Sequence, residues 1–507
     1  MPRRRVIAIA AKLALAASFC SAIASAYDPG RGAELDPAHP VAPVLQAASQ
    51  QTGLLRVILG LALAFTLAIA AAHPLVRRVE RRLGLTVLLS SGLPFLALGV
   101  VFRLPAVGIL TDEVVDDLRP ALEFGIGWLG FLVGLQFDVR ELDRVPDKTG
   151  AVVVAESAVP VLTTAIACST VLLALEPGWS LKAFPSVRAA LYDFTTHAPL
   201  RDAIALGACA AQAAPVAAVA IARSSGSVGA KILEHVTRLD DVASALLLAL
   251  VCAFFRPTDA YATWKLPHIA WVFIELGMGG VLGILTYVLV RGAKSAAEEI
   301  ACLLGAIALS AGMSGYLGIS PLVTCAIAGA LLTNLPMKHS ARLKETMTTV
   351  ERPLYMIFLV VAGALWNPMA WQGWVLVPVF VFARVGGKLI GAHLAKRVGP
   401  DELPDAATLG LALAPQSPIA IATIVSYVTL YRAQTELAGN FPFLMTAVIG
   451  GGVLTELTVQ ILVRLRGGLR FDMRDPSMVS ILPPGEIGAS MSSIPPPVSR
   501  PPSSESP

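Results

Sequence analysis

The sequence is dominated by long apolar segments, and these limit the chain to a membrane-embedded fold. Of its 507 residues, 55% are hydrophobic and 15% are charged, and the mean hydropathy of +0.69 exceeds that of soluble globular proteins. The segments are long enough to span about 30 Å of hydrocarbon at about 1.5 Å per helical residue. We therefore expect an all-α polytopic membrane protein with about thirteen transmembrane helices. The predicted helices cover residues 53–73, 85–102, 120–138, 149–175, 201–222, 232–255, 268–290, 298–315, 317–335, 352–367, 371–395, 405–430 and 441–465.

The two ends of the chain differ in composition from the central region. Residues 1–26 begin with a basic cluster and end in Ala24-Ser25-Ala26, which is typical of a cleavable signal peptide. Lys12 interrupts the apolar part of this segment, so an uncleaved extra helix is the alternative. We expect residues 27–52 to form an external lead-in, residues 53–466 the transmembrane domain, and the Pro/Ser-rich residues 467–507 a disordered cytoplasmic tail.

The distribution of basic residues predicts how the helices are oriented. With the mature N-terminus outside, the cytoplasmic segments carry 21 Lys and Arg residues and the outer loops carry 8. This excess agrees with the positive-inside rule. We therefore expect a multi-pass protein of the cell inner membrane, with the N-terminus outside and the C-terminus in the cytoplasm.

Two adjacent carboxylates, Asp240 and Asp241, lie inside the otherwise apolar stretch TRLDDVASALLLALVCAFF. A charged carboxylate at bilayer depth costs several kcal/mol, so it persists only where it has a partner or faces a water-filled cavity. Two carboxylates this close titrate as a coupled pair. The stretch therefore predicts an ion-binding or proton-binding site. The alternative is that both residues mark the cytoplasmic end of their helix.

Two of the predicted helices, 201–222 and 405–430, contain an interior proline. Each has a Leu-Gly pair, and the proline, Pro215 or Pro418, follows nine residues after the leucine. A proline removes a backbone donor and breaks the helix, which frees carbonyl groups and helix ends inside the membrane. We expect two discontinuous helices that cross near the midplane and carry the substrate site. The alternative is that each proline is a simple kink.

The two proline-containing helices lie seven positions apart in the series. Both carry a glutamine near the middle, Gln212 or Gln416, and Ser417 precedes the second proline. Weaker similarities at the same separation pair helices 1–6 with helices 8–13. Because seven is odd, matched helices run in opposite directions. This pattern predicts an inverted-topology repeat with helix 7 as the linker.

A basic patch that includes Arg384 and Lys388 also lies at membrane depth. Lys388 is eight residues from Lys396 at the inner end of its helix, and Asp240 is nine residues from Lys231. Both residues are therefore about 12–14 Å from the inner face at about 1.5 Å per residue, which allows an Asp240–Lys388 ion pair. A lysine that releases its proton when a cation displaces it would couple the two ions. Snorkelling of Lys388 to the interface is the alternative.

Several segments together resemble the monovalent cation:proton antiporters. These segments are the Asp pair after a basic loop, GWLGFLVGLQFDVREL at 127–142, GISPLVTCAIAGALLTN at 318–334, RVGGKLIG at 384–391 and LGLALAP at 409–415. They occur in the expected order within residues 53–466. They are similar to the branch that holds the bacterial sodium/proton antiporters and the Kef-type potassium efflux systems.

The resemblance implies a six-helix core domain, a dimerisation domain, a homodimer and an elevator-like alternating-access cycle. In the electrogenic sodium/proton members an Asp pair and a lysine form the site, and Asp240, Asp241 and Lys388 match these positions. The resemblance makes Asp241 the ligand of the monovalent cation and the proton carrier. It makes Asp240 the partner of Lys388.

One position departs from the family pattern, which has Thr or Ser beside the first proline. Here Ala213 and Ala214 precede it, and Gln212 is the nearest polar residue. The leading interpretation is a secondary antiporter that exchanges Na⁺, or alternatively K⁺ or Li⁺, for H⁺. The other hypotheses are a proton-independent gated K⁺ efflux channel, a symporter of organic anions and a transport-dead sensor on the same fold.

The chemistry expected of the chain is limited to ions and protons. The sequence has neither a Walker-type loop nor a Gly-rich nucleotide-binding fingerprint, and its cysteines lack metal-binding spacing. We expect no enzyme activity, no cofactor and no nucleic-acid partner. Three further embedded carboxylates are Glu156, Glu275 and Glu456, and Glu156 is the first candidate to join the cavity. Arg384 is the other secondary candidate.

Overall fold

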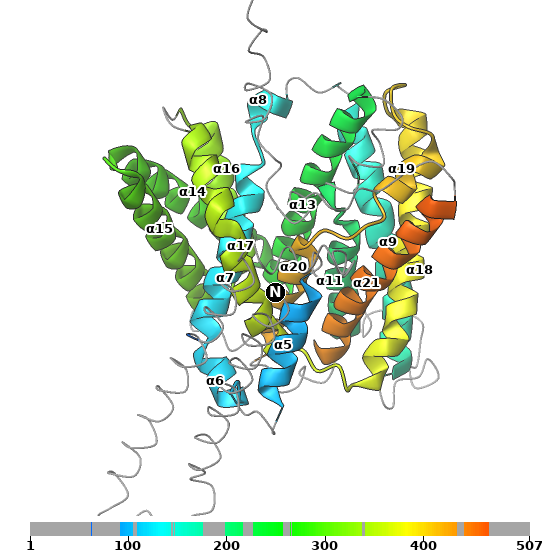
Figure 1. Ribbon diagram of the computed structural model, residues 1–507, viewed down its shortest axis with the longest axis horizontal. Helices are drawn as coiled ribbons and strands as arrows, with labels where there is room; N and C mark the ends of the chain where they lie inside the picture. Colours follow the sequence, from blue (N-terminus) through cyan, green and yellow to red (C-terminus); the bar gives the residue numbers. More distant parts are fainter. Residues whose placement is uncertain are drawn as a thin grey trace, which may run out of the picture.

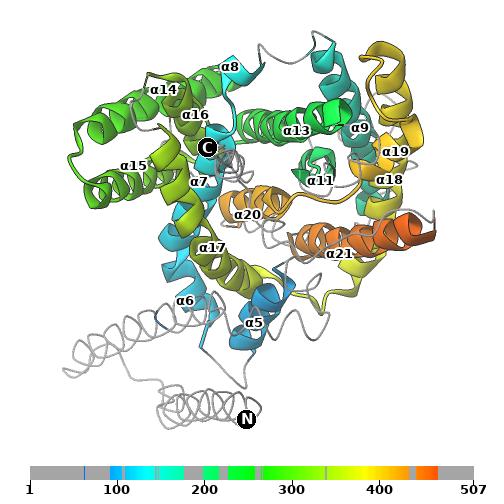
Figure 2. The same cartoon turned by 45° about the horizontal axis from the view of Figure 1, so that its top comes forward.

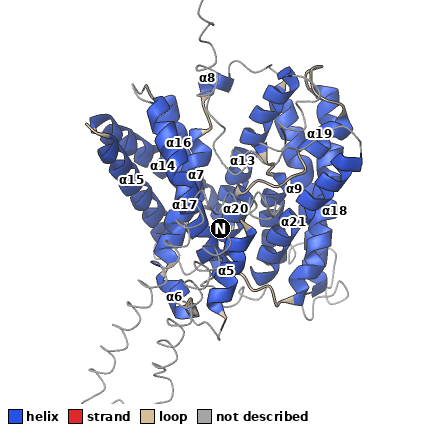
Figure 3. Cartoon of the chain, in the orientation of Figure 1, coloured by secondary structure: helices blue, strands red, loops and turns tan. Residues whose placement is uncertain are grey.

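The computed structural model describes residues 92–104, 109–142, 148–175, 198–215, 227–256, 266–336, 340–432 and 441–465, with the single positions 62, 146, 218 and 264. These residues form helices and connecting loops, with one isolated antiparallel bridge as their only β structure (Figure 3). The predicted signal peptide, lead-in and tail lie outside the described residues, as does nearly all of the predicted first helix.

The helices follow the predicted apolar segments closely. α9, α14, α15, α18 and α21 are long and apolar enough to cross a membrane. Together they confirm the prediction of an all-helical, multi-pass membrane protein. The described helices are α5 (Leu93–Arg103), α6 (Asp112–Asp117), α7 (Arg119–Leu135), α8 (Val139–Leu142), α9 (Thr149–Leu175), α11 (Ala198–Ala211), α13 (Ser227–Phe254), α14 (His268–Gly292), α15 (Ala296–Leu317), α16 (Pro321–Asn334), α17 (Ser340–Leu365), α18 (Trp371–Val398), α19 (Ala406–Ala412), α20 (Ile419–Tyr431) and α21 (Phe441–Leu465).

Helical segments outside the predicted ranges include the first turns of α17 and the short helices α6 and α8. α17 begins at Ser340, well before the expected start at residue 352, because its first turns read SARLKETMTTVE and are too polar to be recognised as membrane-spanning. The short helix α6 is started by Thr111, whose hydroxyl accepts a hydrogen bond from the backbone N of Val114.

The helices form two groups that meet at α13 and α20 (Figures 1 and 2). One group contains α9, α11, α18, α19 and α21, and α9 packs along α18; we call it the α9–α18 group. The other contains α5, α7, α14, α15, α16 and α17, and α7 packs along α16; we call it the α7–α16 group. α13 and α20 contact members of both groups.

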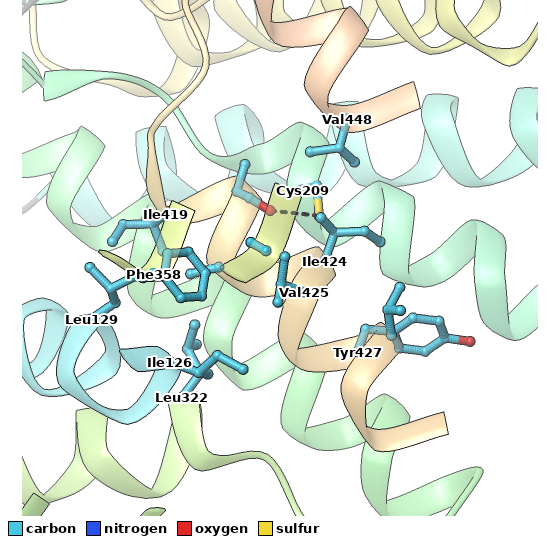
Figure 4. Packing of buried hydrophobic residues seen from close by; sticks show 14 of the residues in the cluster. Ile126, Leu129, Cys209, Leu322, Phe358, Ile419, Ile424, Val425, Tyr427 and Val448 are labelled. Atoms are coloured by element: carbon cyan, nitrogen blue, oxygen red, sulfur yellow. Dashed lines mark hydrogen bonds between the residues drawn. The ribbon is translucent and has the colours of Figure 1, made fainter. Parts of the chain in front are cut away.

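Apolar side chains fill the region around α20 (Figure 4). Ile126 of α7, Leu322 of α16 and Phe358 of α17 are buried in the same cluster as Ile424 of α20. Towards the other group, the Cys209 thiol of α11 contacts the Ala420 carbonyl at 3.6 Å. The face of α20 towards the α7–α16 group is therefore largely apolar.

Close helix contacts are made at glycines, as is common in membrane proteins. A Cβ atom on Gly130 of α7 would lie 2.0 Å from the Leu322 carbonyl oxygen of α16. One on Gly134 would lie 1.9 Å from the Ala326 carbonyl oxygen of the same helix. A Cβ on Gly329 of α16 would lie 2.3 Å from the Phe131 carbonyl oxygen of α7. Only glycine allows the two backbones to approach this closely.

Replacing Gly134 tests this packing. Because an added methyl group would meet backbone rather than a flexible side chain, we expect Gly134→Ala to lower the free energy of unfolding by about 1–3 kcal/mol. Thermal unfolding of the purified protein in detergent measures the change. Gly312→Ala on α15 is the matched control, since its added Cβ meets nothing within 4 Å. An equal effect of the two substitutions would contradict the assignment of Gly134 to a close backbone contact.

Candidate functional site

The two proline-containing segments are both interrupted, and the interruptions meet. α11 ends at Ala211, and a gap of non-helical residues separates α19, which ends at Ala412, from α20, which begins at Ile419. Ala213 and Gln416 form the antiparallel bridge. The backbone N of Ala214 donates to the carbonyl of Pro415 at 2.9 Å. The chain is thus extended at the point where the two segments touch.

The prolines explain where the helices break. Pro418 has no N–H, so the carbonyl of Ala414, four residues earlier, loses its helical donor. Pro215 in the same way has no N–H to donate to the carbonyl of Ala211, the last residue of α11. Buried carbonyls of this kind need another donor. The carbonyls at the interruption therefore need hydrogen-bond donors from other parts of the fold.

Arg384 of α18 donates hydrogen bonds to carbonyls of both interrupted segments. Its guanidinium is fully buried and donates to the carbonyl of Ala414. A second nitrogen donates to the carbonyl of Gln212 at 2.6 Å and to that of Pro415 at 3.4 Å. The C-terminal ends of α11 and α19 carry partial negative charge, which a fixed positive charge offsets. Arg384 is therefore a central contact of the interruption, although the sequence indicated it only as a secondary candidate.

The structure brings Asp240 and Lys388 together as an ion pair. Lys388 Nζ of α18 lies 3.0 Å from Asp240 Oδ2 of α13, and both side chains are fully buried. The Ser157 hydroxyl of α9 donates to Asp240 Oδ1 at 2.7 Å. Lys388 also donates to the backbone carbonyl of Glu156 at 2.9 Å, and its Nζ is 3.9 Å from Glu156 Oε2. Three helices thus supply one buried polar cluster.

Asp241 lies beside this cluster with a free oxygen. Its side chain is buried, and its Oδ1 has no hydrogen-bond partner among the described residues. The Ser417 hydroxyl, from the second interruption, is within hydrogen-bonding reach of the carboxyl group. Asp241 therefore links the buried polar cluster to the interrupted segments.

The two glutamines of the interruptions have different surroundings. Gln212 Nε2 donates to Thr423 Oγ1 of α20 at 3.1 Å, which leaves Gln212 Oε1 without a partner among the described residues. The side chain of Gln416 extends towards α21, where a Cβ on Gly452 would lie 2.9 Å from its Oε1. Gln416 Oε1 and Nε2 also have no hydrogen-bond partner among the described residues.

Two further embedded carboxylates lie outside the cluster, and some members of the cluster were not predicted. Glu275 lies on α14 and Glu456 on α21, and neither forms an ion pair with Lys388 among the described residues. The unpredicted members are Ser157 and Thr423. Ser157 could have been suspected from its place beside Glu156, but a hydroxyl in a membrane helix more often bonds its own backbone.

A helical membrane bundle with a buried acid–base cluster at two interrupted helices has the architecture of an ion transporter. The sodium/hydrogen exchanger family (transmembrane) matches residues 64–461. The chain therefore belongs to the sodium/hydrogen exchanger family, a family of transporters rather than enzymes. This confirms the resemblance drawn from the sequence motifs.

The fold is similar to that of a solved member of this class. The sodium proton antiporter MjNhaP1 from Methanocaldococcus jannaschii, whose structure was determined at pH 8, superposes with a TM-score of 0.53 and 14% sequence identity. The superposition covers 83% of this chain and 99% of the antiporter. At this identity the likeness establishes the fold alone. No curated protein sequence matches the chain significantly.

Replacing Arg384 by lysine tests its role at the interruption. Lysine keeps the charge but lacks the planar fork that reaches several carbonyls at once. We expect Arg384→Lys to lower the free energy of unfolding by about 1–3 kcal/mol, because at least one buried carbonyl loses its donor. Chemical or thermal unfolding in detergent measures this. Arg238→Lys, at a half-buried i,i+4 pair with Glu234, is the control and should change stability by less than about 1 kcal/mol.

Proposed function

We propose that the protein is a secondary active antiporter that exchanges a monovalent cation, Na⁺ in the first instance with K⁺ or Li⁺ as alternatives, for protons. The observation that carries the proposal is the placement of Asp241. This buried carboxyl group has a free oxygen and adjoins the Asp240–Lys388 ion pair at the interrupted helices. The match to the sodium/hydrogen exchanger family supports the same conclusion.

The coupling of cation to proton follows from the cost of a buried charge. An ionised carboxylate inside the bilayer is unfavourable unless a cation or a basic group neutralises it. Asp241 can be neutralised by a proton or by a monovalent cation, and the two compete for the same oxygens. Each cation that binds therefore displaces a proton, and exchange requires no ATP.

Asp240 and Lys388 would respond to this change of occupancy. Their ion pair fixes Asp240 while Asp241 is neutral, and a cation on Asp241 draws the carboxylate of Asp240 towards itself. The energy of a buried pair is sensitive to such shifts, because desolvation and attraction nearly balance. The pair is thus suited to report which ion the site holds.

Oxygen atoms near the interruptions would complete the coordination of the cation. Hard cations prefer carboxylate, carbonyl and hydroxyl oxygens. Gln212 Oε1 has no hydrogen-bond partner among the described residues, and the Ser417 hydroxyl is in reach of Asp241. In this chain we assign to Gln212 the position that a Thr or Ser hydroxyl takes in relatives. The presence of this oxygen favours transport over a transport-dead sensor.

We further propose that the fold is an inverted-topology repeat with alternating access. The helix contacts support this. α7 packs on α16, and α5 packs on α17, with glycines against backbone carbonyls in both pairs. If helices 2 and 3 (α5 and α7) correspond to helices 9 and 10 (α16 and α17), the repeat turns one of these two contacts into the other. The interruptions of α11 and of the α19–α20 segment would then be corresponding features.

The proposal includes the setting of the protein. We place it in the cell inner membrane with the N-terminus outside and the C-terminus in the cytoplasm, as the basic residues indicate. α14 exposes Phe273, Val281 and Val288, and this apolar face would contact lipid or the second subunit of a homodimer. A signal peptide at 1–26 and a cytoplasmic tail at 467–507 complete this arrangement.

Neutralising Asp241 tests the function directly. In proteoliposomes loaded with a pH-sensitive dye, Asp241→Asn should reduce cation-driven proton flux to background, because the asparagine amide can neither release a proton nor compensate a cation. Na⁺, K⁺ and Li⁺ are supplied in turn to identify the substrate. Asp117→Asn is the control, since Asp117 is exposed on α6 and should leave the flux unchanged. Cation-driven proton flux that survives in Asp241→Asn would exclude the mechanism.

Gln212→Ala tests the coordination proposed for the cation. The loss of one neutral oxygen ligand, worth about 1 kcal/mol, corresponds to about a fivefold increase in the apparent KM for the cation. The measurement is the cation dependence of proton flux at fixed pH. Gln372→Ala on α18, a half-buried position, serves as the control. An unchanged KM in Gln212→Ala would assign the residue to packing.

A further inference from the structure

Glu156 of α9 is a fully buried carboxyl group without a hydrogen-bond partner. Its side chain has 0% exposure, and neither Oε1 nor Oε2 has a partner among the described residues. Such a group is costly when ionised, since it lacks both water and donors. The exchange cycle proposed above makes no use of it.

Lys388 has one donor left for this carboxyl group. An ammonium carries three N–H donors, and Lys388 uses one for Asp240 Oδ2 at 3.0 Å and one for the Glu156 backbone carbonyl at 2.9 Å. Its Nζ is 3.9 Å from Glu156 Oε2. A small rotation of either side chain would bring the two groups into contact. Lys388 is therefore placed between two carboxyl groups, one paired and one not.

The close approach of α9 and α18 fixes this arrangement. A Cβ on Gly387 would lie 2.7 Å from Pro160 Cα, and one on Gly391 would lie 2.9 Å from the Ala155 carbonyl oxygen and 3.5 Å from Glu156 Cδ. Glycine at 391, three residues after Lys388, thus leaves the space that the carboxyl group of Glu156 occupies. The RVGGKLIG segment provides both the lysine and this space.

Charge balance distinguishes the two carboxyl groups. The charged groups that act on Glu156 are Lys388 from α18 and Asp240 from α13. On α11, which also packs against α9, Arg201 and Asp202 are paired with each other at 2.9 Å. One ammonium cannot compensate two buried carboxylates. Asp240 receives donors from Ser157 and Lys388, so it holds the negative charge, and Glu156 remains neutral by keeping its proton.

We propose that Glu156 is a second proton-binding site of the antiporter, and that it releases its proton when Lys388 turns from Asp240 to it. This inference rests on the proposed function and specifies where a second proton is held. When a cation on Asp241 draws Asp240 away, the O–H bond of Glu156 breaks, and the proton passes to water that enters when the site opens to one side of the membrane. The electron pair stays on the carboxylate, which then pairs with Lys388. Lys388 keeps its charge throughout.

The coupling ratio tests this assignment. Because Asp241 and Glu156 each release one proton, the wild-type protein should exchange about two protons per cation, and Glu156→Gln about one. The reversal potential of exchange in proteoliposomes, measured at several cation gradients, gives the ratio. Glu275→Gln is the matched control, since Glu275 is equally buried and its carboxyl oxygens also lack partners among the described residues. The same ratio in wild type and Glu156→Gln would overturn the proposal, because Glu156 would then release no proton during exchange.

Infrared spectroscopy provides a test that does not depend on transport. In the Asp241→Asn background, the carbonyl stretch of a protonated carboxyl group should be present at neutral pH, and its intensity should fall when Glu156 is also replaced by Gln. A band that is the same with and without Glu156 would overturn the proposal, because Glu156 would then be ionised at rest. If the wild type shows no exchange, the antiport function fails, while this band still decides whether Glu156 holds a proton. Glu156→Asp retains a carboxyl group and should therefore keep the band. It serves as the comparison if Glu156→Gln is unstable.

Discussion

The ion pair between Asp240 and Lys388 is the interaction on which the site depends. Its two groups are 3.0 Å apart and have no exposed surface, so α9, α13 and α18 must all pack correctly for it to form. A buried ion pair adds little net stability, because the cost of desolvating both groups offsets their attraction. An apolar pair of similar size would hold the helices together equally well. The pair is therefore better explained by a function in which its charges change partners.

The two buried basic residues of α18 have separate roles, which follow from their chemistry. Arg384 and Lys388 lie one turn apart and face the same side. The guanidinium of Arg384 is permanently charged and planar, and it donates to carbonyls of both interrupted segments. The ammonium of Lys388 is a mobile point charge, and it faces two carboxyl groups. Arg384 thus stabilises the broken backbone, while Lys388 can exchange one carboxyl partner for another.

The helices and the depth of the buried charged residues could be predicted from the sequence. The contacts that these residues make could not. α9 begins and ends where its apolar run does, and the fixed rise of a helix was sufficient to place Asp240 and Lys388 at one level. The prolines indicated the interruptions, since their effect is local. The role of Ser157, and the primary role of Arg384, could not be derived in this way. The first depends on how α9 packs against α13, and the second on how α18 lies against the two interrupted segments, and these contacts join residues far apart in the chain.

The helices are joined by polar contacts in some places and by apolar contacts in others. This difference bears on how an alternating-access cycle could operate. Directional polar bonds join α13 and α20 to the α9–α18 group, through Asp240 and through Thr423, so these helices can move as one unit without breaking them. The face of α20 towards the α7–α16 group is mostly apolar, and apolar contacts can slide with little cost because they have no preferred direction. Among the described residues, polar links to the other group include those between Ser320 and Ser426 at 3.0 Å, from Arg256 to the Leu317 carbonyl at 2.8 Å and from Trp366 Nε1 to Thr446 Oγ1 at 3.0 Å. Movement of the unit would have to break these bonds. The ionic cluster would stay intact during this movement, which leaves its rearrangement to the arrival and departure of ions.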